Sequence, residues 1–271
     1  LLLKDSMKKT EVQLVLLNKR SILEQLHLEE ALLRADEKNW CIIHLQPLEA
    51  IVLGISAQPE QVIHLDKLGV RPVPLIKRFS GGGTVFIDQN CLMTTFIFNH
   101  TDIGIPAYPQ PVFLWSEKFY LPLFEGLNFS LKENDYVIDQ RKCGGNAQYM
   151  TKNRWLHHTS FLWDYHVDNM SYLKMPSKMP NYRKAREHHE FLCKLQHYLP
   201  LESFCERFTA HLSEVFKVRL VDFEEACLAL ERPHRRVTDL IPIEKAAVRE
   251  SENCVINTVY KGGFSSQPAT S

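Results

Sequence analysis

The sequence has no excess of charge of either sign. Its 32 lysine and arginine residues balance 32 aspartate and glutamate residues over 271 positions. Proteins that bind nucleic acids or anionic membranes non-specifically need a basic surplus for contact with phosphate. The sequence also lacks a run of about 18 apolar residues, the length that spans a bilayer as a helix. We therefore predict a soluble folded protein whose partners include neither nucleic acid nor membrane.

No Cys-x-x-Cys pair occurs among the seven scattered cysteines, which excludes a zinc ribbon and a thioredoxin-like redox motif. A signal-peptide pattern is also missing, so we expect a reducing compartment. Transit peptides are rich in arginine and poor in acidic residues, whereas the first twenty positions hold Glu11 and a single arginine, Arg20. We expect a cytoplasmic protein, with the mitochondrion or a plastid as alternatives.

Hydrophobic periodicity predicts an α+β fold with a mixed, largely antiparallel sheet and flanking helices. A first helix is expected over 21–34, where Ser21 and Glu24 make a capping box. Strands are expected over 40–45, 50–56, 73–80, 84–88, 91–99, 136–139, 147–150 and 155–163. Further helices are expected over 58–68, 112–126, 185–198, 201–216 and 222–230.

Three consecutive glycines, Gly81, Gly82 and Gly83, stand between two predicted strands. A hairpin turn usually needs two residues, whereas three glycines let bare backbone lie against a ligand and present N–H groups to an anion. Ser80 adds a hydroxyl and Arg78 a planar cation suited to phosphate or carboxylate. An ordinary hairpin tip explains the glycines about as well. The segment is neither a Walker A loop nor a Rossmann fingerprint.

Two further segments contain residue types used in catalysis. Lys142 lies just before Gly144 and Gly145, where an ammonium group can neutralise a carboxylate and a phosphate together, although most such lysines are simply solvated. Of His157 and His158, strand alternation sends one to each face, so the pair does not bind one metal ion. A core histidine is the preferred interpretation over a catalytic base.

The order of these segments resembles the lipoate–protein ligase A family, within the larger biotin/lipoate ligase and octanoyltransferase fold. The segments that carry the resemblance are Leu28–Arg34, Ile51–Gln58, Lys77–Phe86, Asn134–Val137, Arg141–Gln148 and Trp155–Leu162. The strongest is Lys77-Arg78-Phe79-Ser80-Gly81-Gly82-Gly83-Thr84-Val85-Phe86, against a family pattern Arg-Arg-x-Ser-Gly-Gly-Gly-Ala-Val.

The resemblance implies a class II biotin/lipoate ligase-like catalytic domain that uses ATP and Mg²⁺ to convert lipoate, or a fatty acid such as octanoate, to an acyl adenylate. The acyl group then passes to a lysine of a lipoyl-acceptor domain of a 2-oxoacid dehydrogenase or glycine-cleavage type protein. It implies Lys142 as the catalytic residue and assigns no metal ligand. It implies substrate or nucleotide binding by Arg78, Ser80, Gly81, Gly82, Gly83, Thr84, Val85, Phe86, Gly145, Asn146, Ala147 and His158.

The sequence departs from the family pattern at Lys77, at Ile87 and at Thr159, which stands where the family has glycine. We expect an extension or first strand over 1–20, the catalytic domain over 21–220, a short helical appendage over 221–260 and a disordered tail over 261–271. Two alternatives remain at this point. One is an octanoyl or lipoyl transferase of the same fold without ATP, which needs a reactive cysteine. The other is a degenerate protein that binds acyl adenylate or an acceptor domain without turnover.

Overall fold

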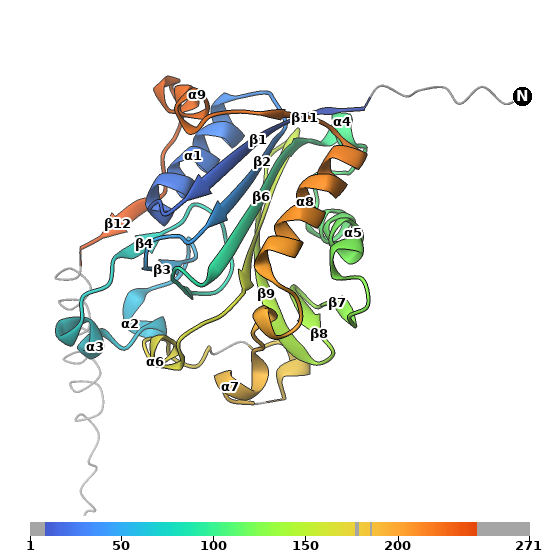
Figure 1. Cartoon of the computed structure of the whole chain (residues 1–271). Coiled ribbons are helices and arrows are strands. Elements are labelled where there is room, and N and C mark those ends of the chain that lie inside the picture. The colour runs from blue at the N-terminus through green and yellow to red at the C-terminus, as the bar shows by residue number, and fades with distance from the viewer. Residues whose placement is uncertain (1–8, 177–178, 185, 243–271) are drawn as a thin grey trace, which may run out of the picture.

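The computed structural model describes residues 9–176, 179–184 and 186–242. Two sheets organise this part of the chain, an eight-stranded sheet in the order β11-β1-β2-β6-β10-β9-β8-β7 and a four-stranded sheet in the order β12-β4-β3-β5. Helices α1 and α9 lie on one side of the large sheet, and α5 and α8 lie on the other (Figure 1). We call the side that faces α1 the site face and the side that faces α5 and α8 the aromatic face.

The large sheet is mixed. Its strands are β1 (Glu11–Asn18), β2 (Trp40–Leu45), β6 (Cys91–Asn99), β7 (Phe129–Lys132), β8 (Asp135–Ile138), β9 (Arg141–Met150), β10 (Arg154–Leu162) and β11 (Lys217–Leu220). Strand β1 is parallel to both β11 and β2, and the other pairings are antiparallel. The small sheet contains β3 (Ala50–Leu53), β4 (Leu75–Lys77), β5 (Val85–Ile87) and β12 (Asp239–Ile241). The predicted fold class, a mixed and largely antiparallel sheet with flanking helices, is confirmed.

The first predicted helix is confirmed as α1 (Ile22–Ala35), and the capping box is formed, because the Ser21 backbone N–H donates to the Glu24 carboxylate at 3.0 Å. The other α-helices are α2 (Pro59–Val62), α3 (Leu65–Val70), α4 (His100–Ile103), α5 (Pro109–Tyr120), α6 (Val167–Met170), α7 (His188–Phe191), α8 (Leu201–Val215) and α9 (Phe223–Cys227). Single 3₁₀ turns cover Leu121–Phe124, Asn181–Arg183, Leu195–His197 and Leu228–Glu231.

Two of the predicted helices are wrong as continuous elements. The segment 58–68 divides into α2 and α3 at Ile63, because Ile63 instead pairs with Leu173 as an isolated bridge. The segment 185–198 contains, among its described residues, only α7 and one 3₁₀ turn. Here the Cys193 N–H donates to the Lys142 carbonyl at 2.9 Å, so a contact with β9 replaces a helical hydrogen bond.

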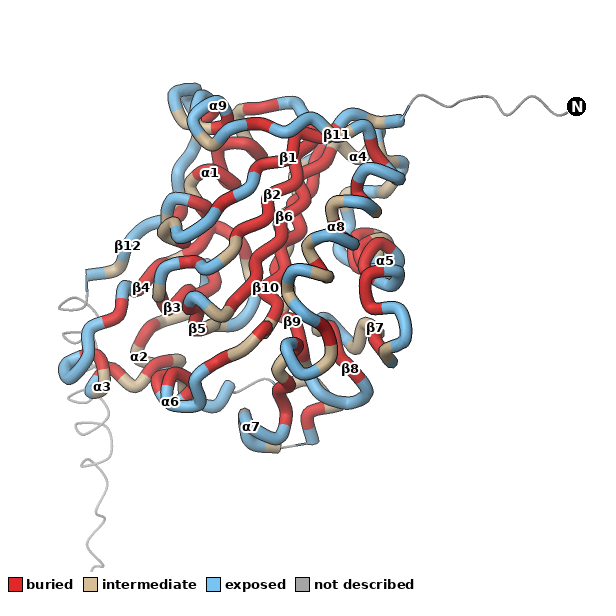
Figure 2. Tube along the Cα trace, viewed as in Figure 1, coloured by how far each residue is buried: buried red, intermediate tan, exposed pale blue. Residues whose placement is uncertain are grey.

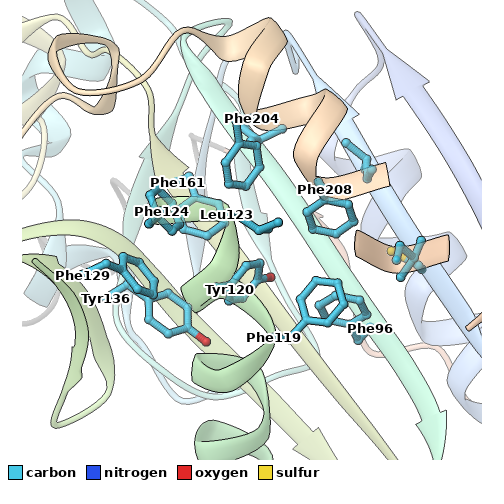
Figure 3. Close-up of a cluster of buried hydrophobic side chains, with 14 of the residues drawn as sticks. Phe96, Phe119, Tyr120, Leu123, Phe124, Phe129, Tyr136, Phe161, Phe204 and Phe208 are labelled. Carbon is cyan, nitrogen blue, oxygen red and sulfur yellow. The ribbon is translucent and has the colours of Figure 1, made fainter. Parts of the chain in front are cut away.

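Aromatic side chains form the core of the aromatic face. Figure 3 shows Tyr120 of α5 and Phe204 of α8 near Phe161 of β10, and Phe119 and Phe208 near Phe96 of β6. The central strands β2, β6 and β10 are buried along nearly their whole length (Figure 2). This burial on both faces explains why β2 and β6 are mostly apolar and do not alternate between apolar and polar residues.

Residues 221–242 of the expected appendage pack on the domain. Ala226 and Ala229 are buried against α1, and β12 pairs with β4 at the edge of the small sheet. The expected tail over 261–271 lies outside the described residues. Within the described part of the chain, no helix has the length and apolar composition needed to cross a membrane.

Candidate functional site

The segment with three glycines crosses between strands and does not form a hairpin. Strands β4 and β5 both pair with β3, on opposite edges, and not with each other. The connection Phe79–Thr84, which we call the glycine loop, therefore passes the end of β3. The Ile55 N–H donates to the Ser80 carbonyl at 3.0 Å and fastens the loop there. The interpretation of the glycines as an ordinary hairpin tip is wrong, because β3 lies between the two strands that they connect.

Arg78 holds the glycine loop from inside. Its guanidinium donates to the carbonyls of Gly81 and Gly83, each at 2.8 Å from Nη2, and to the Val52 carbonyl at 3.4 Å from Nη1. The residue is buried, and this burial lowers its pKa to about 10 while the Glu29 carboxylate opposes the shift. Arg78 thus remains a cation whose N–H groups are used by the loop itself.

Gly54 and Gly82 allow the loop to lie directly on the end of β3. A Cβ atom added to Gly54 would stand 2.2 Å from the Gly82 carbonyl oxygen, a backbone atom that no side-chain rotation can move. Gly82 itself has φ = 105°, in the left-handed region that favours glycine. Beside it, Ser80 is fully buried and its hydroxyl has no hydrogen-bond partner among the described residues. An orphaned buried hydroxyl in this loop is available to a ligand.

A β-bulge decides where Lys142 lies. In the β8–β9 ladder Tyr136 pairs with Gly144 but Val137 pairs with Lys142, so Cys143 is an extra residue on β9. The bulge reverses the alternation and turns Lys142 to the face on which Gly145 stands. The Lys142 Nζ lies 3.2 Å from the position of a Cβ on Gly145, so the ammonium covers bare glycine backbone.

Lys142 makes an ion pair in this structure. Its Nζ lies 2.7 Å from Oδ1 of Asp135, and both side chains are mostly buried. The Tyr182 hydroxyl donates to the other carboxylate oxygen, Oδ2, at 2.9 Å. Burial and the Asp135 charge together raise the pKa of Tyr182, which keeps that phenol protonated as a donor. Asp135 therefore holds Lys142 in place and has a second donor of its own.

Four of the predicted residues converge on the site face. Ala147 is the next residue after Gly145 whose side chain points to this face, and the Cβ position of Gly82 lies 3.7 Å from the Ala147 methyl group. His158 pairs directly with Ala147 across β10 and β9. Lys142, Gly145, Ala147 and His158 thus line one face beneath the glycine loop.

Other predicted residues have side chains directed elsewhere. Asn146 belongs to the aromatic face, where its amide accepts from Thr159 Oγ1 at 2.7 Å and donates to the Asn134 carbonyl at 3.0 Å. The Phe86 ring packs against Tyr172 in the core beneath the small sheet. Because Thr159 bonds to Asn146, its side chain also lies on the aromatic face and does not line the site face. Its hydroxyl connects β10 to β9 behind the site face. Thr84 and Val85 are both partly buried. The Thr84 hydroxyl has no hydrogen-bond partner among the described residues.

Sequence reasoning missed a buried polar network beside the site. Glu29 of α1 is fully buried, and its carboxylate accepts from Thr95 at 2.6 Å, from Gln25 at 2.7 Å and from Nδ1 of His158 at 3.1 Å. Burial raises the pKa of Glu29, but the His158 charge and these hydrogen bonds outweigh it and lower the pKa overall. The sequence signal that could have indicated this network is the position of Glu29 on the apolar face of the predicted helix.

The neighbouring histidine and thiol are unsuited to acid–base or nucleophilic work. Burial, reinforced by the charge of His158, lowers the pKa of His157 to about 3, so this ring is neutral. Cys143 is fully buried in the core of the aromatic face, and burial raises its pKa well above the ordinary value for a thiol. Cys143 thus faces away from Lys142, on the opposite side of β9.

The sequence and the fold are both similar to those of known lipoate–protein ligases. A family model described as the lipoyl protein ligase A/B catalytic domain matches residues 21–217. The sequence is 28% identical over 218 residues to the inactive lipoate–protein ligase 2 of Plasmodium falciparum, covering 68% of this chain and 54% of that protein. It is 25% identical over 192 residues to a lipoate–protein ligase of Bacillus subtilis, covering 65% and 56%. The chain spans about half the length of these curated relatives.

Two solved structures have a similar fold. A lipoate–protein ligase A bound with ATP superposes with a TM-score of 0.68 at 19% identity, over 82% of this chain and 94% of that one. The bipartite lipoate protein ligase of Thermoplasma acidophilum, described with its E2 lipoyl domain, gives a TM-score of 0.65 at 20% identity, over 82% and 91%.

Proposed function

The chain belongs to the lipoyl protein ligase A/B catalytic domain family, and from this premise we propose that it activates lipoate or octanoate with ATP. The products of the first step are an acyl adenylate and pyrophosphate. In the second step the acyl group passes to a lysine of an acceptor domain. The observation that carries the proposal is the bulge that turns Lys142 over the bare backbone of Gly145, on the face that the glycine loop covers.

The chemistry of adenylation fits this arrangement. A carboxylate must approach the α-phosphate of ATP although both are anions, so the step needs fixed positive charge and enforced proximity. Lys142 supplies the charge when it exchanges its Asp135 partner for the two reacting anions. The glycine loop, with Ser80, Gly81 and Gly82, covers the acyl chain and shields the mixed anhydride from water. Arg78 acts through the loop, since its N–H groups hold the carbonyls of Gly81 and Gly83.

The rest of the predicted set contacts the nucleotide in this proposal. Gly83 and Thr84 end the glycine loop, Val85 and Phe86 begin β5, and the backbone of Gly145 to Ala147 lies beneath the loop. The solved structure of similar fold that was obtained with ATP supports ATP as the activating nucleotide. For residues with side chains in the core, such as Phe86, the contact is through the backbone.

Magnesium is expected to arrive with the nucleotide. Among the described residues, no group of three or more histidine, cysteine, aspartate or glutamate side chains is placed to hold a metal ion. Mg²⁺ commonly binds through substrate phosphates and one or two carboxylates, so the site needs no metal cage of its own. Asp135 is the carboxylate beside Lys142 that such an ion would meet. When bound, the ion would neutralise charge on the phosphates.

The expected protein partner is a lipoyl-acceptor domain of a 2-oxoacid dehydrogenase or glycine-cleavage type protein. The Thermoplasma acidophilum ligase of similar fold was described together with its E2 lipoyl domain, which supports this class of partner. The cytoplasm remains the proposed location, with the mitochondrion or a plastid as alternatives.

ATP–pyrophosphate exchange with lipoate or octanoate tests the proposal. We expect exchange with the wild-type protein and none with Lys142→Ala. Lys132→Ala is the matched control, since Lys132 lies on the edge strand β7, with β8 between it and β9, and its side chain donates a hydrogen bond to Gln140. Exchange that persists in Lys142→Ala contradicts the assigned role.

A second candidate is a protein that binds lipoyl adenylate without making it. The relative in Plasmodium falciparum is named inactive, and the ion pair with Asp135 occupies Lys142. Absence of exchange together with tight binding of lipoyl adenylate would favour this candidate. The transferase alternative lacks support, because Cys143, the thiol next to Lys142 in the sequence, is buried in the core.

A further inference from the structure

Asp135 has one side-chain donor on each of its two carboxylate oxygens. The Lys142 Nζ lies 2.7 Å from Oδ1, and the Tyr182 hydroxyl donates to Oδ2 at 2.9 Å. In the part of the chain that the structure describes, no other side chain donates to this carboxylate. The Asp135 side chain is only 14% exposed, so the two donors compensate for the loss of water around a mostly buried charge.

Contacts away from the ion pair hold Tyr182 in place. Its ring packs against the Phe191 ring with 5.2 Å between the centroids, and its backbone N–H donates to Oε1 of Glu133 at 3.2 Å. Nη2 of Arg186 donates to the carbonyls of Tyr182 and Gln140, each at 2.9 Å, which ties the tyrosine to the connection between β8 and β9. None of these contacts involves the lysine, so the phenol keeps its position when the lysine moves.

The proposed reaction breaks only one of the two contacts with Asp135. Lys142 must turn from this carboxylate to the acyl carboxylate and the α-phosphate. A mostly buried carboxylate that lost its last donor would bear the cost of its desolvation without compensation. With Tyr182 in place, Asp135 keeps one charge-assisted hydrogen bond after Lys142 leaves. The phenol therefore stabilises this state more than it stabilises the ion pair, because only here is it the last side-chain donor.

We propose that Tyr182 is a positioning residue, which acts through Asp135 to free Lys142 for the two reacting anions. The inference rests on the proposed function, because Lys142 exchanges partners only if it neutralises a carboxylate and a phosphate. Before the ligand binds, Asp135 keeps the ammonium over the bare backbone of Gly145. After the exchange, Tyr182 is the group that compensates the charge of Asp135.

Calorimetric titration with lipoyl adenylate tests the role of the phenol. Mg²⁺ is left out, so that no metal ion can neutralise Asp135. We expect Tyr182→Phe to bind about tenfold more weakly than the wild-type protein, because the ring remains and only a hydrogen bond to a charged group is lost. Tyr198→Phe is the matched control. It loses a phenol hydrogen bond with Arg141, at 2.7 Å, and should keep the wild-type affinity.

A double-mutant cycle separates positioning from loss of structure. Asp135→Asn preserves the shape of the side chain but leaves no charge to be stranded when Lys142 moves. In the Asp135→Asn background, Tyr182→Phe should therefore change the affinity for lipoyl adenylate by less than twofold. A tyrosine that only supported the fold, or that contacted the ligand itself, would lower the affinity by the same factor in both backgrounds.

Binding and turnover give distinguishable failures. An unchanged affinity in Tyr182→Phe, or an equal loss in the two backgrounds, overturns the inference. Failure of lipoyl adenylate to bind the wild-type protein or Asp135→Asn also overturns it. Absence of ATP–pyrophosphate exchange, with the cycle as expected, would contradict the proposed activity alone, because binding of the adenylate needs no turnover.

Discussion

Replacing Arg78 with methionine tests whether this residue organises the loop or contacts the nucleotide. In the structure its guanidinium donates to the carbonyls of Val52, Gly81 and Gly83. Methionine preserves much of the buried volume but offers no donor. We therefore expect Arg78→Met to lose stability as well as ligand binding, because the loop loses its internal support.

The expected cost follows from the state of each carbonyl. Hydrogen bonds from a charged donor contribute about 1.5–3 kcal/mol each. Gly81 is partly exposed and Gly83 is exposed, so water can replace the guanidinium as the donor to their carbonyls. Val52 is buried, so its carbonyl loses its donor without replacement. Removing the buried Arg78 charge also removes the free-energy cost of its desolvation, which partly offsets the loss of the hydrogen bonds. We expect a net loss of about 2–4 kcal/mol in the free energy of unfolding.

Urea denaturation at pH 7 measures this loss, and titration with lipoyl adenylate measures binding in the same preparations. Arg71→Met is the matched control, because Arg71 is half exposed and its ion pair with Glu49 is screened by solvent. That variant should change stability much less. Wild-type stability in Arg78→Met combined with lost binding would refute the reasoning and assign Arg78 directly to the ligand.

Three other substitutions test separate features. Gly54→Ala should sharply reduce binding of lipoyl adenylate in calorimetry, because its methyl group would stand 2.2 Å from the Gly82 carbonyl and displace the loop, whereas Gly69→Ala, with nothing within 4 Å, should bind normally. His157→Gln should flatten the pH dependence of stability between pH 6.5 and 4. The wild-type ring has its pKa lowered to about 3, so the unfolded state takes up more protons there and urea midpoints fall as pH falls, and an unchanged slope would contradict this. Thr159→Gly should lower the free energy of unfolding by about 1–2 kcal/mol in urea titrations and leave ligand binding intact, since Thr159 lies behind the site face; weakened binding at unchanged stability would place it in the site.

Much of the fold could be predicted because the signals are local. The capping box at Ser21 depends on residues three apart, and the alternating or continuous apolar runs mark the central strands. The helix predicted over 185–198 failed for the opposite reason. Its sequence has an acceptable helical pattern, but pairing with β9 at Leu192 and Cys193 gives the backbone other partners. Local propensity cannot report such competition.

The sequence predicted part of the arrangement that the structure shows at the candidate site. The order of its motifs indicated Lys142 and the glycine loop, and the structure brings Lys142, Gly145, Ala147 and His158 to one face beneath that loop. Asn146 was expected among them, but its side chain lies on the other face, as alternation next to Ala147 requires. The Glu29 network was missed, because a carboxylate on a helix is usually solvated. The residues around Glu29 in the sequence also give no indication of its partner His158, which lies 129 positions away.

The sequence by itself determined most of the element types, the glycine backbone and the presence of a lysine before two glycines. Only the tertiary structure decided which way that lysine faces. Strand alternation alone would place Lys142 with Gly144, against the aromatic core, and the bulge at Cys143 turns it to the Gly145 side. A bulge arises from the pairing of two strands, so its position is a property of the β8–β9 ladder and not of either segment. Likewise, three glycines permit a close approach of backbone, but the position of β3 between β4 and β5 determines what they approach.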